Sequence, residues 1–101
     1  MATGHRSAEL RSLAFHRTVA ERLDDALLDH ARARVARWNA DGGPVHPVWA
    51  GRWLELLDQP RDEIVRVLSA DDQRSRDLRQ NTPFAGALTP RERWQIVRNV
   101  G

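Results

Sequence analysis

The arginine side chains of the C-terminal third are the groups in this sequence best suited to binding chemistry. A guanidinium group binds phosphate or carboxylate oxygens through two parallel hydrogen bonds. Five arginines form this group: Arg74, Arg76, Arg79, Arg91 and Arg93. They predict a site for phosphate, nucleic acid or the carboxylates of a partner protein. The alternative is that they are solvated or paired within the chain with Asp71, Asp77 or Glu92.

An apolar loop lies between these arginines, Pro83-Phe84-Ala85-Gly86-Ala87-Leu88. Loops run over the surface and are normally polar, so an apolar loop is either packed under helices or kept for a partner. Thr89-Pro90-Arg91-Glu92 follows it and has the pattern of a capping box with proline at the first helical position. We predict that Phe84 and Leu88 are exposed, and that with the flanking arginines they form the centre of a partner-binding surface.

Catalytic and metal-binding signatures are missing from the sequence. It has no His-Glu-x-x-His pair, no glycine-rich phosphate loop and no serine nucleophile motif. The histidines, at positions 5, 16, 30 and 46, lack the spacing of metal ligands. We therefore predict a protein that is not an enzyme and uses no cofactor or metal. His16 lies on an apolar helix face and is predicted to be a buried neutral histidine with a hydrogen-bond partner, with a catalytic or ligand role as the alternative.

Helical periodicity and capping residues predict the elements that position these groups. We expect an all-α fold, a single small bundle of five to six short helices, with residues 1–6 disordered and residues 7–101 forming one helical domain. The first two helices should form an antiparallel hairpin. The expected helices cover about 7–23, 25–39, 47–58, 60–68, 70–80 and 90–99.

The apolar positions of these helices predict one shared core. Its expected members are Leu13, Leu28, Val35, Trp38, Trp49, Trp53, Leu57, Leu68 and Trp94. The helix at about 70–80 differs, because only Ala70 and Leu78 can anchor it. A helix this polar is poorly held by packing. We expect it to be mobile or to be held by something outside the chain.

Composition and charge limit the class of protein further. The chain of 101 residues favours one domain, has no Cys, and has no apolar run that approaches a membrane span or a signal peptide. We predict a cytoplasmic protein. The balance of Arg against Asp and Glu is +2 over residues 1–37, −4 over 38–72 and +4 over 73–101. This asymmetry favours self-association, or an acidic partner for the basic end.

Two segments carry a resemblance to a known group of proteins. Leu13-Ala14-Phe15-His16-Arg17 and the stretch from Arg79 to Trp94 resemble short helical bacterial proteins of mostly unknown function, some of them encoded beside toxin-like partners and treated as antitoxins. The resemblance covers nearly the whole chain but transfers no catalytic or binding residue. It implies a protein that acts by binding another protein, with binding to its own operator as a second role left open.

These observations lead to one functional hypothesis and two alternatives. The hypothesis is an antitoxin-like interaction protein that neutralises a toxin-like partner through its arginine-rich C-terminal third. The first alternative is a nucleic-acid-binding regulator, in which helices 60–68 and 70–80 form a helix-turn-helix. That helix pair would present Arg74, Ser75, Arg76, Arg79 and Gln80 to bases and phosphates. The second alternative is a structural homodimer that joins the acidic middle of one copy to the basic end of the other.

Overall fold

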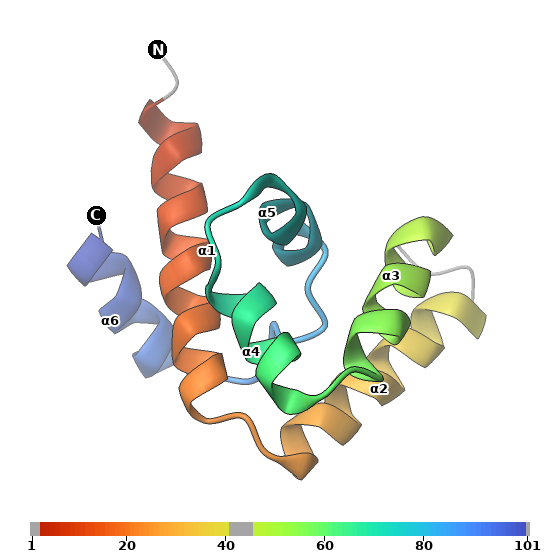
Figure 1. Ribbon diagram of the computed structural model, residues 1–101. Coiled ribbons are helices and arrows are strands. Elements are labelled where there is room, and N and C mark those ends of the chain that lie inside the picture. The colour runs from red at the N-terminus through yellow and green to blue at the C-terminus, as the bar shows by residue number, and fades with distance from the viewer. Residues whose placement is uncertain (1–2, 41–45, 101) are drawn as a thin grey trace.

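The structure is a computed structural model that describes residues 3–40 and 46–100 (Figure 1). In these ranges it contains six helices and no strand, which confirms the all-α prediction. Disorder was expected for residues 1–6, but the first helix already begins at Thr3, and residues 1–2 lie outside the described ranges. The helices are α1 (Thr3–Glu21), α2 (Asp25–Ala40), α3 (Pro47–Leu57), α4 (Arg61–Ser69), α5 (Gln73–Gln80) and α6 (Pro90–Val100).

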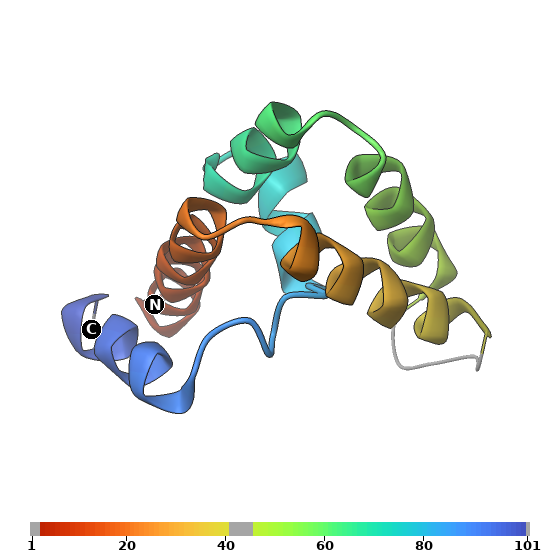
Figure 2. The same cartoon turned by 90° about the horizontal axis from the view of Figure 1, so that it is seen from below.

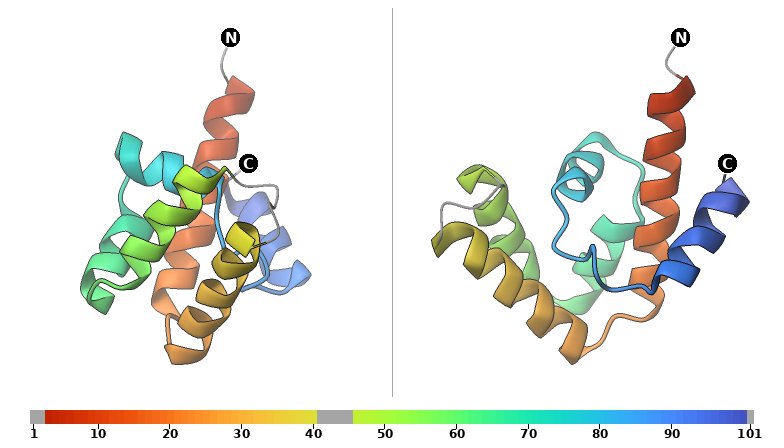
Figure 3. Two further views of the ribbon diagram at one scale, coloured as in Figure 1. Left: turned by 90° about the vertical axis from the view of Figure 1, so that its right-hand side faces the viewer. Right: turned by 180° about the vertical axis from the view of Figure 1, so that it is seen from behind.

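The helices form two groups that meet at α4 and α5. Helix α2 packs against α3, whereas α1 packs against α4, α5 and α6. Figures 2 and 3 show α2 and α3 on one side of the molecule, α1 and α6 on the other, and α4 and α5 between them. The hairpin expected of α1 and α2 is therefore wrong. The short connection after Glu21 lets α2 diverge from α1, and Asp24 caps the new helix by accepting a hydrogen bond from the Leu27 N–H at 2.8 Å.

Trp53 on α3 lies at the centre of the core and is fully buried. Its indole Nε1–H donates to the Leu78 carbonyl at 3.1 Å, and its ring meets Phe84 edge to face with centroids 5.9 Å apart. Among the other predicted core residues, Leu13, Leu28, Val35, Leu57 and Leu68 are buried, and Trp38 and Trp49 are half-buried at the edge. Trp94 is the exception, because 61% of its surface is exposed.

Helix α5 is held firmly by groups of the chain itself, contrary to the expectation that it is mobile or held from outside. Its residues Ser75, Leu78 and Arg79 are buried. Arg79 Nη1 donates to the carbonyls of Val67 at 3.2 Å and Ala70 at 2.5 Å, at the end of α4 where helix carbonyls lack partners. Asp72 caps α5 by accepting from the Ser75 N–H at 2.8 Å. Polar side chains thus do the anchoring that apolar packing does elsewhere.

Helix α6 begins as predicted but packs differently. The Thr89 Oγ1 accepts from the Glu92 N–H at 3.2 Å, and Glu92 Oε1 accepts from the Thr89 N–H at 3.0 Å, which is the predicted capping box. Glu92 also forms an ion pair with Arg22 at the end of α1. No residue of α6 is buried, and α1 is the one helix it packs against in the described part of the chain. Its outer face is therefore open to solvent.

Candidate functional site: the α6 face and the cleft beside it

The two apolar residues predicted to dock a partner lie inside the molecule. Phe84 is 2% exposed and Leu88 is 6% exposed, and both belong to the core cluster. The prediction of an exposed Phe84–Leu88 surface is therefore wrong. The loop runs inward because the Thr82 hydroxyl accepts from the Phe84 N–H at 3.0 Å, which turns the Phe84 ring toward Trp53. Its apolar residues are needed to complete the core of this short chain.

The five predicted arginines do not form one surface. Arg79 is buried at the end of α4, as described above. Arg76 is half-buried and donates from Nε to the Asp71 carboxylate at 2.9 Å, which pairs it within the chain. Arg74 is exposed on α5, and Arg91 and Arg93 are exposed on α6. The structure therefore leaves three of the five available to a partner.

The arrangement expected of a helix-turn-helix is also wrong in part. Ser75 and Arg79 were expected to face nucleic acid from α5, but both face the interior, with 1% and 3% of their surfaces exposed. The outer side of this helix carries Gln73, Arg74 and Gln80, with Arg76 and Asp77 half-buried at its edge. A reading helix needs its base-contacting side chains on its exposed face.

A cleft with a volume of about 280 Å³ lies between α1 and α6, and we call it the α1–α6 cleft. Its apolar lining comes from Phe15, Ala85, Ile96 and Val97. Its cationic lining comes from Arg11, Arg79 and Arg93, and no Asp or Glu belongs to the lining. The Arg93 guanidinium lies over the Phe15 ring, 5.9 Å from its centroid. The cleft thus combines apolar walls with positive charge, which suits an anionic group carried on an apolar body.

Arg79 contributes a charge at the inner end of this cleft that the described residues do not pair with a carboxylate. Its Nε is buried without a hydrogen-bond partner. Burial lowers the pKa of Arg79, and the nearby Asp71 and Asp72 charges oppose that shift. Loss of solvent around a cation with no paired carboxylate makes an approaching anion more favourable.

His16 lies beside Arg79 and is buried and neutral, which confirms its prediction. Its Nδ1–H donates to the Ser12 carbonyl at 2.7 Å, so Nε2 accepts from the Thr82 hydroxyl at 2.8 Å. Burial lowers the pKa of His16 to about 4. Both ring nitrogens are therefore occupied by the chain, and His16 positions Thr82 at the start of the buried loop.

The outer face of α6 continues this site onto the surface. Trp94 is 61% exposed and Val97 is 39% exposed. Arg91 and Arg98 lie three residues before and four residues after Trp94, so all three side chains share one side of the helix. Neither arginine has a hydrogen bond or an ion pair with a residue that the structure describes. We call Arg91, Trp94, Val97 and Arg98 the α6 face.

Sequence reasoning missed the α6 face because it assigned Trp94 to the core. An amphipathic helix normally turns its apolar residues inward. The signal that could have identified the face is the spacing of Arg91 and Arg98 around Trp94, which places two cations on the same side as the aromatic ring. A core-facing tryptophan is rarely bracketed by charged residues at both of these positions.

Neither similarity to known proteins nor an ion-binding geometry singles out a class of function. Comparison of the chain with family models, curated proteins and solved structures found no match. Over residues 3–40 and 46–100, no group of three or more His, Asp or Glu side chains is arranged to hold a metal ion. In the same ranges, none of the helices has both the length and the apolar character of a membrane span.

Proposed function

We propose that this protein acts by binding an acidic partner protein through the α6 face. The observation that carries the proposal is the exposed Trp94 with Arg91 and Arg98 on the same side of the helix, in a helix that has no buried residue. Tryptophan and arginine are the residues most enriched among those that dominate the energy of protein interfaces. Because Trp94 is exposed and does not contribute to the core, it is available to bind another molecule.

The chemistry of the site indicates the kind of surface that would fit it. The Trp94 ring would enter an apolar pocket of the partner, and the two flanking guanidinium groups would pair with carboxylates at the rim of that pocket. The α1–α6 cleft adjoins the face through Val97, and Arg93 adds a further cation to the cleft. An acidic side chain of the partner would therefore be received in the cleft. Arginines at the rim would also speed the encounter at low salt.

The antitoxin-like role is the finer form of this proposal. In that form the partner is a toxin-like protein in the cytoplasm, and the α6 face covers an acidic groove or active site on it. The resemblance of residues 13–17 and 79–94 to antitoxin-like proteins supports this form. The docking surface differs from the expected one, because Trp94 takes the place of Phe84 and Leu88 as the apolar anchor.

Binding to the product of the neighbouring gene tests the proposal. We expect Trp94→Ala to weaken the complex by about 2 kcal/mol or more, and Arg91→Glu to weaken it by a similar amount through charge reversal. Arg74→Glu, on the exposed side of α5, is the matched control and should leave affinity nearly unchanged. Isothermal titration measures the three affinities.

The same variants distinguish the other outcomes. Equal affinity of wild type and Trp94→Ala would refute the α6 face as the docking surface. A doubled mass in solution that Trp94→Ala returns to the monomer would assign the face to self-association. Binding to an operator-length duplex, with affinity falling steeply with salt and insensitive to Trp94→Ala, would favour the nucleic-acid alternative.

A further inference from the structure

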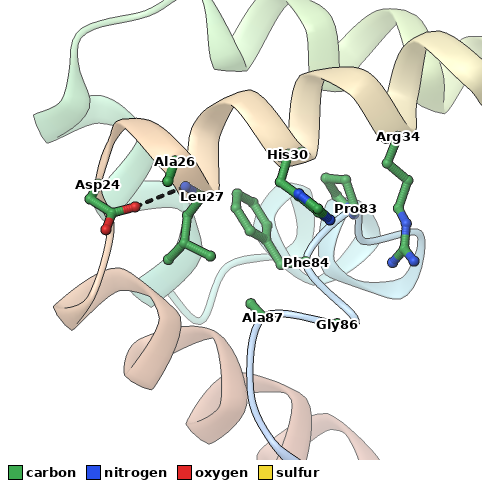
Figure 4. Close-up of a pocket in the computed structure, with 10 residues that line it drawn as sticks. Asp24, Ala26, Leu27, His30, Arg34, Pro83, Phe84, Gly86 and Ala87 are labelled. Atoms are coloured by element: carbon green, nitrogen blue, oxygen red, sulfur yellow. Dashed lines mark hydrogen bonds between the residues drawn. The ribbon is translucent and has the colours of Figure 1, made fainter.

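A second cavity lies on the other side of the buried loop, between α2 and residues 83–87 (Figure 4). Its volume is about 340 Å³, at the small end of the range of about 300–1,000 Å³ typical of ligand pockets. We call it the α2–loop pocket. It shares no lining residue with the α1–α6 cleft or the α6 face. Binding in this pocket is therefore independent of binding at the α6 face.

Two side chains on one face of α2 give this pocket a polar end. His30 and Arg34 are four residues apart and so lie on adjacent turns of the same face. Figure 4 shows both side chains directed toward the loop. Arg34 is half-buried, yet it has no hydrogen bond or ion pair with any residue that the structure describes. A partly desolvated guanidinium without an acceptor favours the arrival of an anion.

The rest of the pocket is mainly apolar. Leu27 and Ala31 contribute from α2, and Phe84 and Ala87 contribute from the loop. Asp24 lies at the end away from Arg34, where its carboxylate caps α2 through the Leu27 N–H. Repulsion from Asp24 would turn the anionic end of a ligand toward Arg34. The pocket thus has one cationic end, an apolar floor and one acidic end.

We propose that the α2–loop pocket binds a small carboxylic acid with an apolar body. The carboxylate accepts hydrogen bonds from the Arg34 guanidinium, with His30 beside it as a further donor. The apolar body, a short alkyl or arylalkyl group, lies over Ala31, Ala87 and the edge of Phe84. Arg34 and His30 thus hold the ligand without reacting with it.

Gly86 allows a test that fills the pocket without disturbing the fold. A Cβ atom built at Gly86 meets no atom within 4 Å, and the backbone there is outside the left-handed region. Gly86→Leu should therefore fold normally, and we expect its longer side chain to compete with a ligand for the pocket that Gly86 lines. Gly51→Leu on α3 is the matched control, because Gly51 also has open space around it and lies outside the pocket.

Titration of the full chain with phenylpropionate and with hexanoate tests the proposal. Calorimetry should give a dissociation constant on the order of millimolar for ligands of this size. Phenylpropionamide, which has the same body without the charge, should bind about tenfold more weakly or worse. We expect Arg34→Gln to weaken binding of the acid about tenfold or more, and Arg74→Gln, at an exposed position of α5 outside the pocket, to leave it unchanged. Gly86→Leu should abolish binding, and Gly51→Leu should retain it.

Amide shifts in nuclear magnetic resonance spectra locate the bound acid, and we expect the largest shifts at Ala31 and Ala87. The proposal is overturned if neither acid binds saturably, if the amide binds as well as the acid, or if a folded Gly86→Leu variant binds like wild type. If Gly86→Leu fails to fold, the comparison of Arg34→Gln with Arg74→Gln decides the question. Equal affinity of those two variants would also overturn it.

Discussion

Helix α5 is polar in composition but has buried residues, whereas helix α6 carries several apolar residues but has none that is buried. Helix α5 has one large apolar residue, Leu78, yet three of its side chains are buried and two of its neighbours are tied to it by hydrogen bonds. Helix α6 contains Trp94, Ile96, Val97 and Val100, yet none of its residues is buried. The difference lies in their surroundings. Helix α5 is enclosed by α1, α3 and α4, whereas α1 is the one helix among those the structure describes that contacts α6.

The comparison teaches that composition alone does not decide which of these two helices is buried. A polar helix enclosed on several sides is stabilised when its polar groups find acceptors, as Arg79 does at the end of α4. Helix α6 keeps an open face although it carries Trp94, Ile96 and Val97. That open face is where the proposed partner surface lies.

The largest expected effect is a difference in the free energy of unfolding between variants of one apolar residue on α5 and one on α6. Leu78→Ala on α5 should lower the free energy of unfolding by about 2–5 kcal/mol, because Leu78 is 2% exposed and packed in the core. Trp94→Ala on α6 should lower it by less than about 1 kcal/mol, since alanine also has the higher helix propensity. Urea denaturation followed by circular dichroism measures both. An equal loss for the two variants would mean that α6 belongs to the core.

The second expected effect is a dependence of the free energy of unfolding on pH. It arises from His16, which lies on α1 near the end of α5. The pKa of His16 is about 4 in the folded protein, lowered from 6.5 chiefly by burial, so the unfolded chain takes up the proton first. The free energy of unfolding is then highest above pH 6.5 and decreases as the pH falls toward 4. We expect a loss of about 2 kcal/mol by about pH 5.

Unfolding at intervals from about pH 7 to about pH 5 measures this slope. The slope should be absent in His16→Gln and should remain in His30→Gln, a substitution at an exposed position. The carboxylates of Glu63, Asp72 and Glu92 have lowered pKa values and add their own loss only at more acidic pH. A slope that persists in His16→Gln would contradict the assignment to His16.

The smallest expected effect is the difference in free energy of unfolding between variants of one arginine on α5 and one on α6. Arg79→Met should lower the free energy of unfolding by about 1–2 kcal/mol, because the carbonyls of Val67 and Ala70 lose their donor. Arg93→Met, on the exposed side of α6, should change it by less than about 0.5 kcal/mol. Thermal unfolding of the two variants at neutral pH tests this. A neutral Arg79→Met would show that apolar packing, not the hydrogen bonds, holds α5.

Much of the fold was predictable because its signals are local. The capping pair Thr89 and Glu92 marked the start of α6, and periodicity marked the core positions Leu28, Val35 and Leu57. His16 was predictable because a histidine inside an apolar helix face is usually buried and hydrogen-bonded. The candidate site was predicted less well. Arg91 and Arg93 are exposed as required, but Phe84, Leu88 and Arg79 are buried and Trp94 was placed in the core.

By itself the sequence determined where the helices begin and how their residues alternate between faces, since these features depend on hydrogen bonds and side chains only a few positions apart. The tertiary structure alone decided which apolar residues are covered. Phe84 is buried because Trp53, distant in sequence, meets it, whereas Trp94 is open on a helix that packs, within the described ranges, against no helix other than α1. Burial depends on contacts between residues that are distant in sequence, and no local sequence pattern specifies which of those residues meet.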